Sequence, residues 1–294
     1  MSDGSAPRPR EGTATGPDGT RLYVSDEGDL PGVPALLCDG LACDGFIWKY
    51  LKPALLQDRR VAHWHYRAHG RSEAPRDHRR IHIADHAADL HAVLRHLELP
   101  RAALLGHSMG TQVCLEAYRQ RPEAVAALVL VCGSYGNITR TFKGSDALLH
   151  AIPRMQSFID RHPVISRALW ASGPADLLAA ASRWLGEVDT LRMQTEDLVP
   201  YFAHIARMDP STFFRILAAA GAHTAEDLLP SIRVPTLIIA AENDSFTPVR
   251  YAEQMARQIP GAELLRLRGA SHAAPLEQRA EVNEAVRRFL AELP

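Results

Sequence analysis

The chain has 294 residues, which is enough for one large α/β domain or two small domains. Its hydrophobic content of 46% suits a substantial core, and its net charge of −1 gives no global field that would favour nucleic acid or an anionic membrane. The four cysteines form no C-x-x-C pair, the N-terminus lacks a secretory-signal pattern, and no apolar run is long enough to span a bilayer. We therefore expect a cytoplasmic protein with reduced thiols and no nucleic-acid or membrane partner.

The first half of the chain alternates between apolar runs and stretches with helical periodicity. Residues 1–17 are rich in Gly, Pro, Ser and Thr, and are expected to form a disordered tail. Strands are expected at 20–24 (an edge strand), 35–38, 61–66, 102–105 and 125–132, and helices at 46–56, 83–97 and 109–120. Strands that are apolar on both faces, alternating with amphipathic helices, predict a parallel sheet covered on both sides.

This alternation stops over residues 135–229, which are expected to be mostly helical. It resumes with expected strands at 235–241 and 263–267, and expected helices at 248–258 and 276–290. We therefore predict an α/β core made of residues 18–134 and 230–294. Residues 135–229 are predicted to form a helical cap over one end of its sheet.

The apolar strand at 102–105 is followed directly by Gly106-His107-Ser108-Met109-Gly110. This pattern predicts a sharp turn from a strand into a helix, with a serine at its tip and glycines where side chains would collide. Such a turn exposes the serine hydroxyl beside the first N–H groups of the next helix, and so places a nucleophile next to an anion site. The alternative is a glycine-rich loop whose serine has no catalytic role.

An acid and a base follow later strands of the same predicted sheet. Asp244 lies just beyond the strand that ends near residue 241, and His272 lies just beyond the strand that ends near Leu267. Ligands of open parallel sheets bind beyond the carboxyl ends of the strands, so Ser108, Asp244 and His272 are expected on one rim. A serine needs a base to take its proton and an acid to orient that base. Glu242 is the alternative acid, and His272 could instead be an ordinary loop histidine.

With these motifs, residues 18–292 resemble the α/β-hydrolase superfamily. The motifs that carry the resemblance are Gly-His-Ser-Met-Gly at 106–110, Ala-Glu-Asn-Asp-Ser-Phe-Thr-Pro at 241–248 and Gly-Ala-Ser-His at 269–272. The resemblance implies a mostly parallel, doubly wound sheet of the eight-stranded type, with helices on both faces and a helical cap insertion. It also implies that Ser108 is the nucleophile, His272 the base, and Asp244 the orienting acid. The N–H groups of Met109 and Leu41 would form the oxyanion hole.

Two positions depart together from the pattern of this superfamily. Asp39-Gly40 stands where the family usually has His-Gly, and His65 stands where its D-x-R-G-x-G-x-S loop usually begins with Asp. Because these two strand ends are neighbours in the family's strand order, we hypothesise that Asp39 and His65 form a swapped pair that supports the oxyanion loop. The alternative is that Asp39 faces the substrate pocket, where its charge would oppose a developing oxyanion.

Other polar clusters are better explained without a ligand. His78, His82 and His86 stand at i, i+4 spacing, but a metal site needs three or four convergent donors, so we expect a solvated helix face. Nothing around Cys38 and Cys43 suggests a reactive thiolate. No G-x-G-x-x-G follows the first strands, so we expect no nicotinamide or flavin cofactor. The sequence therefore predicts chemistry without a metal or an organic cofactor.

The expected substrate contacts are mainly aromatic and come from the cap and from the segment after Gly40. The candidates are His107, Trp48, Trp170, Trp184 and Phe202. Phe214, Met155 and Met193 could complete an apolar wall, as could Phe46 and Ile47. At least half of the cap residues are instead expected to pack the cap against the core.

The function that this sequence predicts is hydrolysis of a small ester, lactone or related acyl compound through an acyl-serine. Thioesterases, amidases, C–C hydrolases and perhydrolases share the same triad, although Ala273 stands where C–C hydrolases often have Trp. Dehalogenases and epoxide hydrolases of this fold use an aspartate nucleophile, which Ser108 argues against. A non-catalytic ligand receptor of the same fold is the alternative outside enzymes. We expect a monomer or a homodimer.

Overall fold

The computed structural model describes residues 9–138, 147–172 and 195–293. Its centre is an eight-stranded sheet in the order β1-β2-β4-β3-β5-β6-β7-β8. Strands β1 and β2 pair with antiparallel neighbours, and β4, β3 and β5 to β8 run parallel. The strands are β1 Arg10–Thr15, β2 Arg21–Glu27, β3 Ala35–Cys38, β4 Val61–Trp64, β5 Ala102–His107, β6 Val125–Val131, β7 Thr236–Ala241 and β8 Glu263–Leu267.

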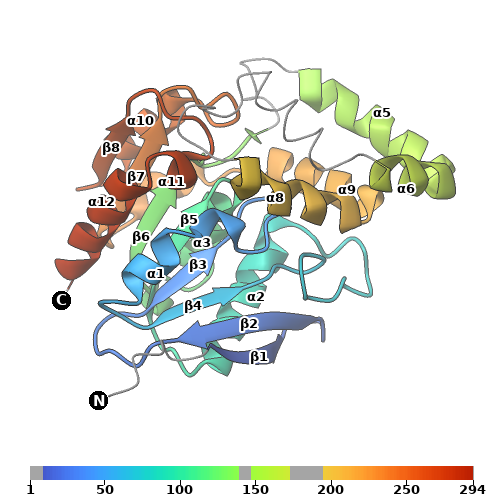
Figure 1. Cartoon of the computed structure of the whole chain (residues 1–294). Coiled ribbons are helices and arrows are strands. Elements are labelled where there is room, and N and C mark those ends of the chain that lie inside the picture. The colour runs from blue at the N-terminus through green and yellow to red at the C-terminus, as the bar shows by residue number, and fades with distance from the viewer. Residues whose placement is uncertain (1–8, 139–146, 173–194, 294) are drawn as a thin grey trace.

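The central strands are buried on both faces, and the helices around them account for that burial (Figure 1). Side chains alternate along β5, so Leu104 joins one apolar cluster and Leu105 joins the other. The first cluster includes residues of α2 (Ile83–His96), α3 (Met109–Gln120) and α10 (Val249–Gln258). The second includes residues of α1 (Leu51–Leu55), α11 (Ala274–Glu277) and α12 (Arg279–Ala291). The predicted doubly wound α/β fold is therefore confirmed.

The described part of the segment between β6 and β7 is mainly helical. It contains α5 (Ala147–Arg161), α6 (Pro163–Ala171), α8 (Thr195–Arg207) and α9 (Pro210–Ala222), which Figure 1 shows gathered at one end of the sheet. Ile152, Ile159 and Phe214 form a small apolar cluster among these helices. We interpret these helices as the predicted cap. Among the residues described here, no helix combines the length and the apolarity needed to cross a membrane.

The N-terminal prediction was partly wrong. Residues 10–15, which were expected to belong to a disordered tail, form β1, and this strand takes the edge position that was expected for residues 20–24. Its pairing with β2 supplies ladder hydrogen bonds, and Ala14 is fully buried. Because most of its other side chains are small or polar, its sequence lacks the apolar pattern that marks a strand. Residues 1–8 lie outside the described residues.

Two further expectations need correction. The single helix expected over 46–56 is a short 3₁₀ helix, Phe46–Trp48, followed by α1, and the final helix is divided into α11 and α12. His86 does not lie on a solvated face: it is fully buried, whereas His78 and His82 are exposed. Burial lowers the pKa of His86 well below its usual value, so the neutral imidazole packs beside Tyr66 as part of the core.

Candidate active site

Ser108 occupies the tight turn between β5 and α3, with φ 54° and ψ −118°. This conformation is rare for a residue with a side chain, and such strain occurs most often at functional sites. The two flanking glycines make the turn possible. A Cβ at Gly106 would collide with the backbone of Gly110, and a Cβ at Gly110 would collide with the carbonyl oxygens of Cys38 and Asp39. The predicted strand-to-helix turn at residues 106–110 therefore has a direct steric basis.

Gly110→Ala is expected to lower the free energy of unfolding by about 1–3 kcal/mol, because the new methyl group overpacks a backbone contact between β3 and α3. Urea denaturation measures this change. Gly32→Ala is the control, since its Cβ meets open space and carries only the strain of a positive φ of 111°. A loss at Gly110 no larger than the loss at Gly32 would contradict the steric explanation.

The predicted acid and base meet the serine at the carboxyl ends of the parallel strands. Asp244 follows β7, and His272 follows β8. The Ser108 hydroxyl donates to His272 Nε2 across 2.9 Å, and His272 Nδ1 donates to Asp244 Oδ2 across 2.8 Å. Ser108 and the His272 side chain are partly exposed, whereas Asp244 is buried. The arrangement can carry a proton from the serine to an imidazole that a carboxylate orients.

The Asp244 carboxylate is held in its ionised form. Burial would raise its pKa, but the His272 imidazole and the hydrogen bonds from Thr247 outweigh burial, so the pKa lies below its usual value. Its Oδ1 accepts from the backbone N–H groups of Phe246 and Thr247, and its Oδ2 accepts from the Thr247 hydroxyl. The alternative acid, Glu242, is exposed and faces Arg266 at 3.7 Å. The geometry therefore favours Asp244.

The loop that carries His272 is fixed from two sides. Glu277 is buried, and its carboxylate accepts from the backbone N–H and the hydroxyl of Ser271 across 2.7 and 2.5 Å. On the other side, His107 Nε2 donates to the His272 carbonyl oxygen across 3.0 Å. Burial lowers the pKa of His107 to about 3, with His272 adding to the effect, so its imidazole is neutral. These contacts hold the His272 backbone in position.

The two predicted oxyanion donors lie on segments that converge on Ser108. Met109 is the first residue of α3, and Leu41 follows Gly40, where an added Cβ would lie 3.3 Å from the Ser108 Cβ. Within the described residues, the N–H groups of Met109 and Leu41 donate to no other protein group. Two unpaired N–H groups beside a nucleophile can stabilise an oxyanion.

The swapped acid–imidazole pair has a different partner from the one predicted. Asp39 is fully buried, and its Oδ2 accepts from Nε2 of His63, not of His65, across 2.8 Å. His65 Nδ1 instead accepts from the Arg71 N–H. His63 and His65 share one face of the strand, and β3 ends at Cys38, so the Asp39 side chain turns back to the nearer imidazole. Burial would raise the pKa of Asp39, but His63 outweighs it, so the pKa lies below its usual value.

Most of the predicted substrate residues are occupied in packing. His107 and Trp48 are 3% and 1% exposed, and their rings contact each other edge to face. Trp170 packs against Phe213 and Phe214 in the cap and donates to the Ile205 carbonyl oxygen. Phe202 is half-buried against the second core cluster and Tyr201. Trp184 and Met193 lie outside the described residues.

Phe246 is a candidate contact that sequence reasoning missed. Its side chain is 39% exposed, and its ring centroid lies 4.9 Å from that of His272. It stands two residues after Asp244, within a motif that was used only to find the acid. An exposed aromatic ring next to the candidate base can contact an apolar part of a substrate.

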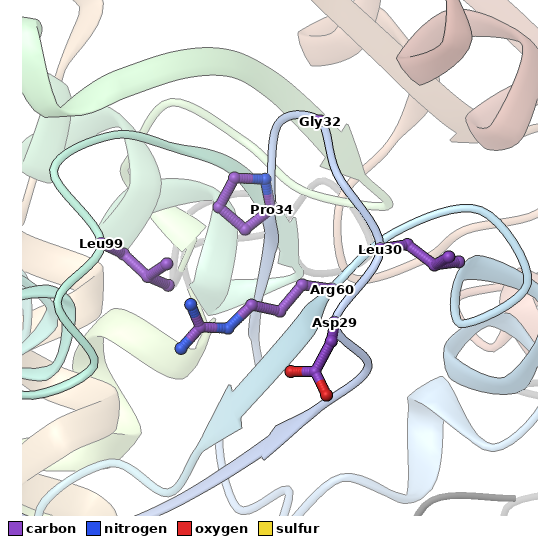
Figure 2. Close-up of a pocket in the computed structure, with 6 residues that line it drawn as sticks. All are labelled: Asp29, Leu30, Gly32, Pro34, Arg60 and Leu99. Carbon is purple, nitrogen blue, oxygen red and sulfur yellow. The ribbon is translucent and has the colours of Figure 1, made fainter.

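A cavity of about 230 Å³ lies at the other end of the strands from Ser108 (Figure 2). Pro34 directly precedes β3 and Arg60 directly precedes β4, so this cavity opens at the amino ends of the strands. The Arg60 guanidinium that lines it already donates to both oxygens of Asp26, across 2.8 Å each. The cavity is therefore too far from Ser108 to hold a substrate that this serine attacks. Over the described ranges, no cluster of three or more His, Cys, Asp or Glu side chains is placed to hold a metal ion.

Comparisons with known proteins bear on the family and the fold. The model of the alpha/beta hydrolase fold family matches residues 34–163, and that of the TAP-like protein family matches residues 219–293. The chain is 30% identical over 283 residues to "Putative carbamate hydrolase RutD" of Variovorax paradoxus, a match that covers 92% of this chain and 96% of that protein.

Two further matches differ in how much of the relative they cover. The chain is 32% identical over 286 residues to "Polyketide synthase ThaQ" of Burkholderia thailandensis, which covers 94% of this chain but only 12% of the synthase. The solved structure described as "Est816 as an N-Acyl homoserine lactone degrading enzyme" matches with a TM-score of 0.73 and 26% identity, over 95% of this chain and 100% of that one. Family models, relatives and sheet topology together show that the chain belongs to the α/β-hydrolase superfamily and is a hydrolase of this fold.

Proposed function

We propose that this protein is a serine hydrolase that cleaves small esters or lactones through an acyl-serine. The observation that carries the proposal is the hydrogen-bonded series from Ser108 Oγ to His272 and from His272 to Asp244, at 2.9 and 2.8 Å. The N–H groups of Met109 and Leu41 beside this series, which have no acceptor in the described part of the chain, support the same chemistry.

In the first half of the reaction, Ser108 Oγ attacks the carbonyl carbon of the substrate while His272 Nε2 takes the hydroxyl proton. The carbonyl oxygen becomes an oxyanion, and the N–H groups of Met109 and Leu41 donate to it; each such donor typically contributes about 2.7–4 kcal/mol. The tetrahedral intermediate collapses, the bond to the leaving alkoxide oxygen breaks, and His272 gives its proton to that oxygen. Asp244 stabilises the imidazolium throughout.

In the second half, water replaces the alcohol. His272 Nε2 takes a proton from water, whose oxygen attacks the acyl carbon and forms a second oxyanion in the same donor pair. Collapse of this intermediate breaks the bond to Ser108 Oγ, which takes back the proton from His272, and the acid is released. The two half-reactions together consume one water, and His272 holds the transferred proton between the steps of each.

The wall of the site and one solved relative support the proposed substrate class. Phe246 offers an exposed ring beside His272, which suits an apolar acyl or alcohol group. One solved relative is described as degrading N-acyl homoserine lactones, and a lactone opens by the same two steps with its alcohol remaining attached to the acyl group. We therefore place esters and lactones with small apolar groups first among the acyl substrates.

Two measurements test this function. A fluorophosphonate probe at pH 8 should label the wild type at Ser108, which mass spectrometry of the labelled peptide identifies. A series of p-nitrophenyl esters of increasing chain length, together with acyl lactones, should then give turnover and rank the substrates. A wild type that neither takes the label nor turns over any member of the series would contradict a hydrolytic role for Ser108 and would favour ligand binding without turnover.

A further inference from the structure

Ala42, next to the candidate oxyanion donor Leu41, is held by two buried imidazoles. Its N–H donates to His69 Nε2 across 3.0 Å, and its carbonyl oxygen accepts from His204 Nδ1 across 2.8 Å. His69 belongs to the loop after β4, whereas His204 lies on cap helix α8. The two side chains are 0% and 3% exposed. One residue of the oxyanion loop is therefore tied both to the core and to the cap.

Each imidazole acts at once as a donor and as an acceptor, which requires the neutral form. His69 Nδ1 donates to the Arg67 carbonyl oxygen across 3.0 Å, so its Nε2 is free to accept from Ala42. His204 Nδ1 donates to Ala42, so its Nε2 accepts from the Gly70 N–H across 2.8 Å. His204 thus connects the loop at residue 42 to the loop at residue 70. The four hydrogen bonds form one network, buried except at the exposed Gly70, in which each ring has a defined tautomer.

This network acts on the peptide group that directly follows the candidate donor Leu41. The Ala42 N–H belongs to the same peptide plane as the Leu41 carbonyl, and Ala42 has a φ of 57°, which residues with a side chain rarely adopt. Such a conformation persists only where its surroundings hold it. Bonds on both sides of Ala42 restrain the peptide plane that follows Leu41, and so limit how far the Leu41 N–H can turn. That N–H has no acceptor among the described residues, so its position depends on its neighbours.

We propose that His204 is a positioning residue through which cap helix α8 sets the geometry of the oxyanion hole, with His69 as the core half of the same clamp. The proposal rests on the function proposed above. It makes the cap a structural part of the reaction centre, since α8 holds the loop through the hydrogen bond from His204 to Ala42. Displacing an oxyanion donor weakens its stabilisation of the transition state much more than it weakens binding of the substrate.

The test compares His204→Ala and His204→Asn with Asp197→Asn. Asp197 is buried on α8 and binds Lys49 and Tyr50 of the core, so Asp197→Asn alters a separate contact of the same helix and leaves the hydrogen bond from His204 to Ala42 in place. His204→Ala should lower kcat about 10- to 100-fold with KM changed much less, because misplacing a reacting group costs up to about 100-fold. His204→Asn, whose amide can still donate to the Ala42 carbonyl, should recover most of kcat. Asp197→Asn should keep kcat near that of the wild type.

Hydrogen exchange gives a second readout that needs no turnover. Peptides that cover residues 41–43 should exchange faster in His204→Ala than in the wild type, and should be unchanged in Asp197→Asn. Unchanged exchange in His204→Ala, or an equal loss of kcat in Asp197→Asn, would overturn the clamp while leaving the proposed hydrolase intact. If the wild type takes no fluorophosphonate label, the proposed function fails, and exchange at residues 41–43 still decides whether His204 holds the loop.

Discussion

Ser108→Ala is expected to lower kcat for the best p-nitrophenyl ester by about 10⁶-fold, because without the hydroxyl no acyl-enzyme can form. The remaining rate should come from the oxyanion donors and from substrate binding alone. The fold should tolerate this change, since Ser108 holds its turn through backbone contacts: its N–H donates to Val131, and its carbonyl accepts from Thr111. Initial rates together with the urea midpoint measure the two effects separately.

Asp244, the proposed orienting acid, and the nearby Glu242 provide a matched pair of variants. Asp244→Asn should lower kcat by about 10⁴-fold, because an amide can hold His272 in the wrong tautomer and does not stabilise the imidazolium. Glu242→Gln changes an exposed carboxylate two residues earlier and should leave kcat as in the wild type. A large loss in Glu242→Gln with little loss in Asp244→Asn would reverse the assignment. Combining Asp244→Asn with Ser108→Ala should add almost nothing, since the two residues act as a unit.

The second large effect is a steep loss of stability in mild acid. Burial lowers the pKa of His65 to about 3, that of His69 to about 4 and that of His107 to about 3. In the unfolded chain these imidazoles titrate near 6.5. Between roughly pH 6.5 and pH 4, the unfolded state therefore binds protons at these positions that the folded state does not. The stability that the neutral imidazoles contribute is complete above pH 6.5 and is lost as the pH falls towards 4.

The size of this effect follows from the number of groups. Each group contributes a slope of about 1.4 kcal/mol per pH unit, so the three together give roughly 4 kcal/mol per unit near pH 5. A domain is stable by about 5–15 kcal/mol, so a fall from pH 7 to pH 5 should remove a large part of that margin. Urea denaturation at pH 7.5, 6.0 and 5.0 measures the slope directly.

A pair of histidine variants separates buried from exposed groups. His65→Gln should reduce the slope by about 1.4 kcal/mol per pH unit, because one titrating group is removed. His78→Gln, at an exposed position, should leave it unchanged. Equal stability of the wild type at pH 7.5 and pH 5.0 would contradict the neutral, buried state of these imidazoles.

The sequence predicted the parts of the molecule that depend on short segments. The alternation of apolar strands with helices gave the doubly wound sheet, and the rule that carboxyl ends share one rim placed Ser108, Asp244 and His272 together. The three side chains are joined by two hydrogen bonds in the structure, and their catalytic roles stay a proposal. The Gly106 and Gly110 positions were also readable, because steric demands at a tight turn act between near neighbours in the chain.

Features that depend on the meeting of distant side chains could not be predicted. The pairing of Asp39 with His63 and not with His65 depends on where β3 ends, which strand patterns define only within a few residues. The contact of His204 with Ala42 joins residues 162 positions apart through a cap whose docking has no local sequence pattern. His86 is the exception: it stands three residues after Ile83 and four before Leu90, on the apolar face of α2, so the helical spacing indicated its burial and the prediction missed it.

The order of the strands along the chain has a consequence for protein synthesis. The turn with the proposed nucleophile follows β5, but the proposed base lies 164 residues later, after β8, which is the edge strand at the far end of the sheet. A growing chain on the ribosome thus carries its serine for most of its synthesis with no partner to take the proton. Contacts of such large sequence separation form late in folding. On the proposed mechanism, turnover begins only when the last strand has joined the sheet, and chains truncated before residue 272 are expected to be inert.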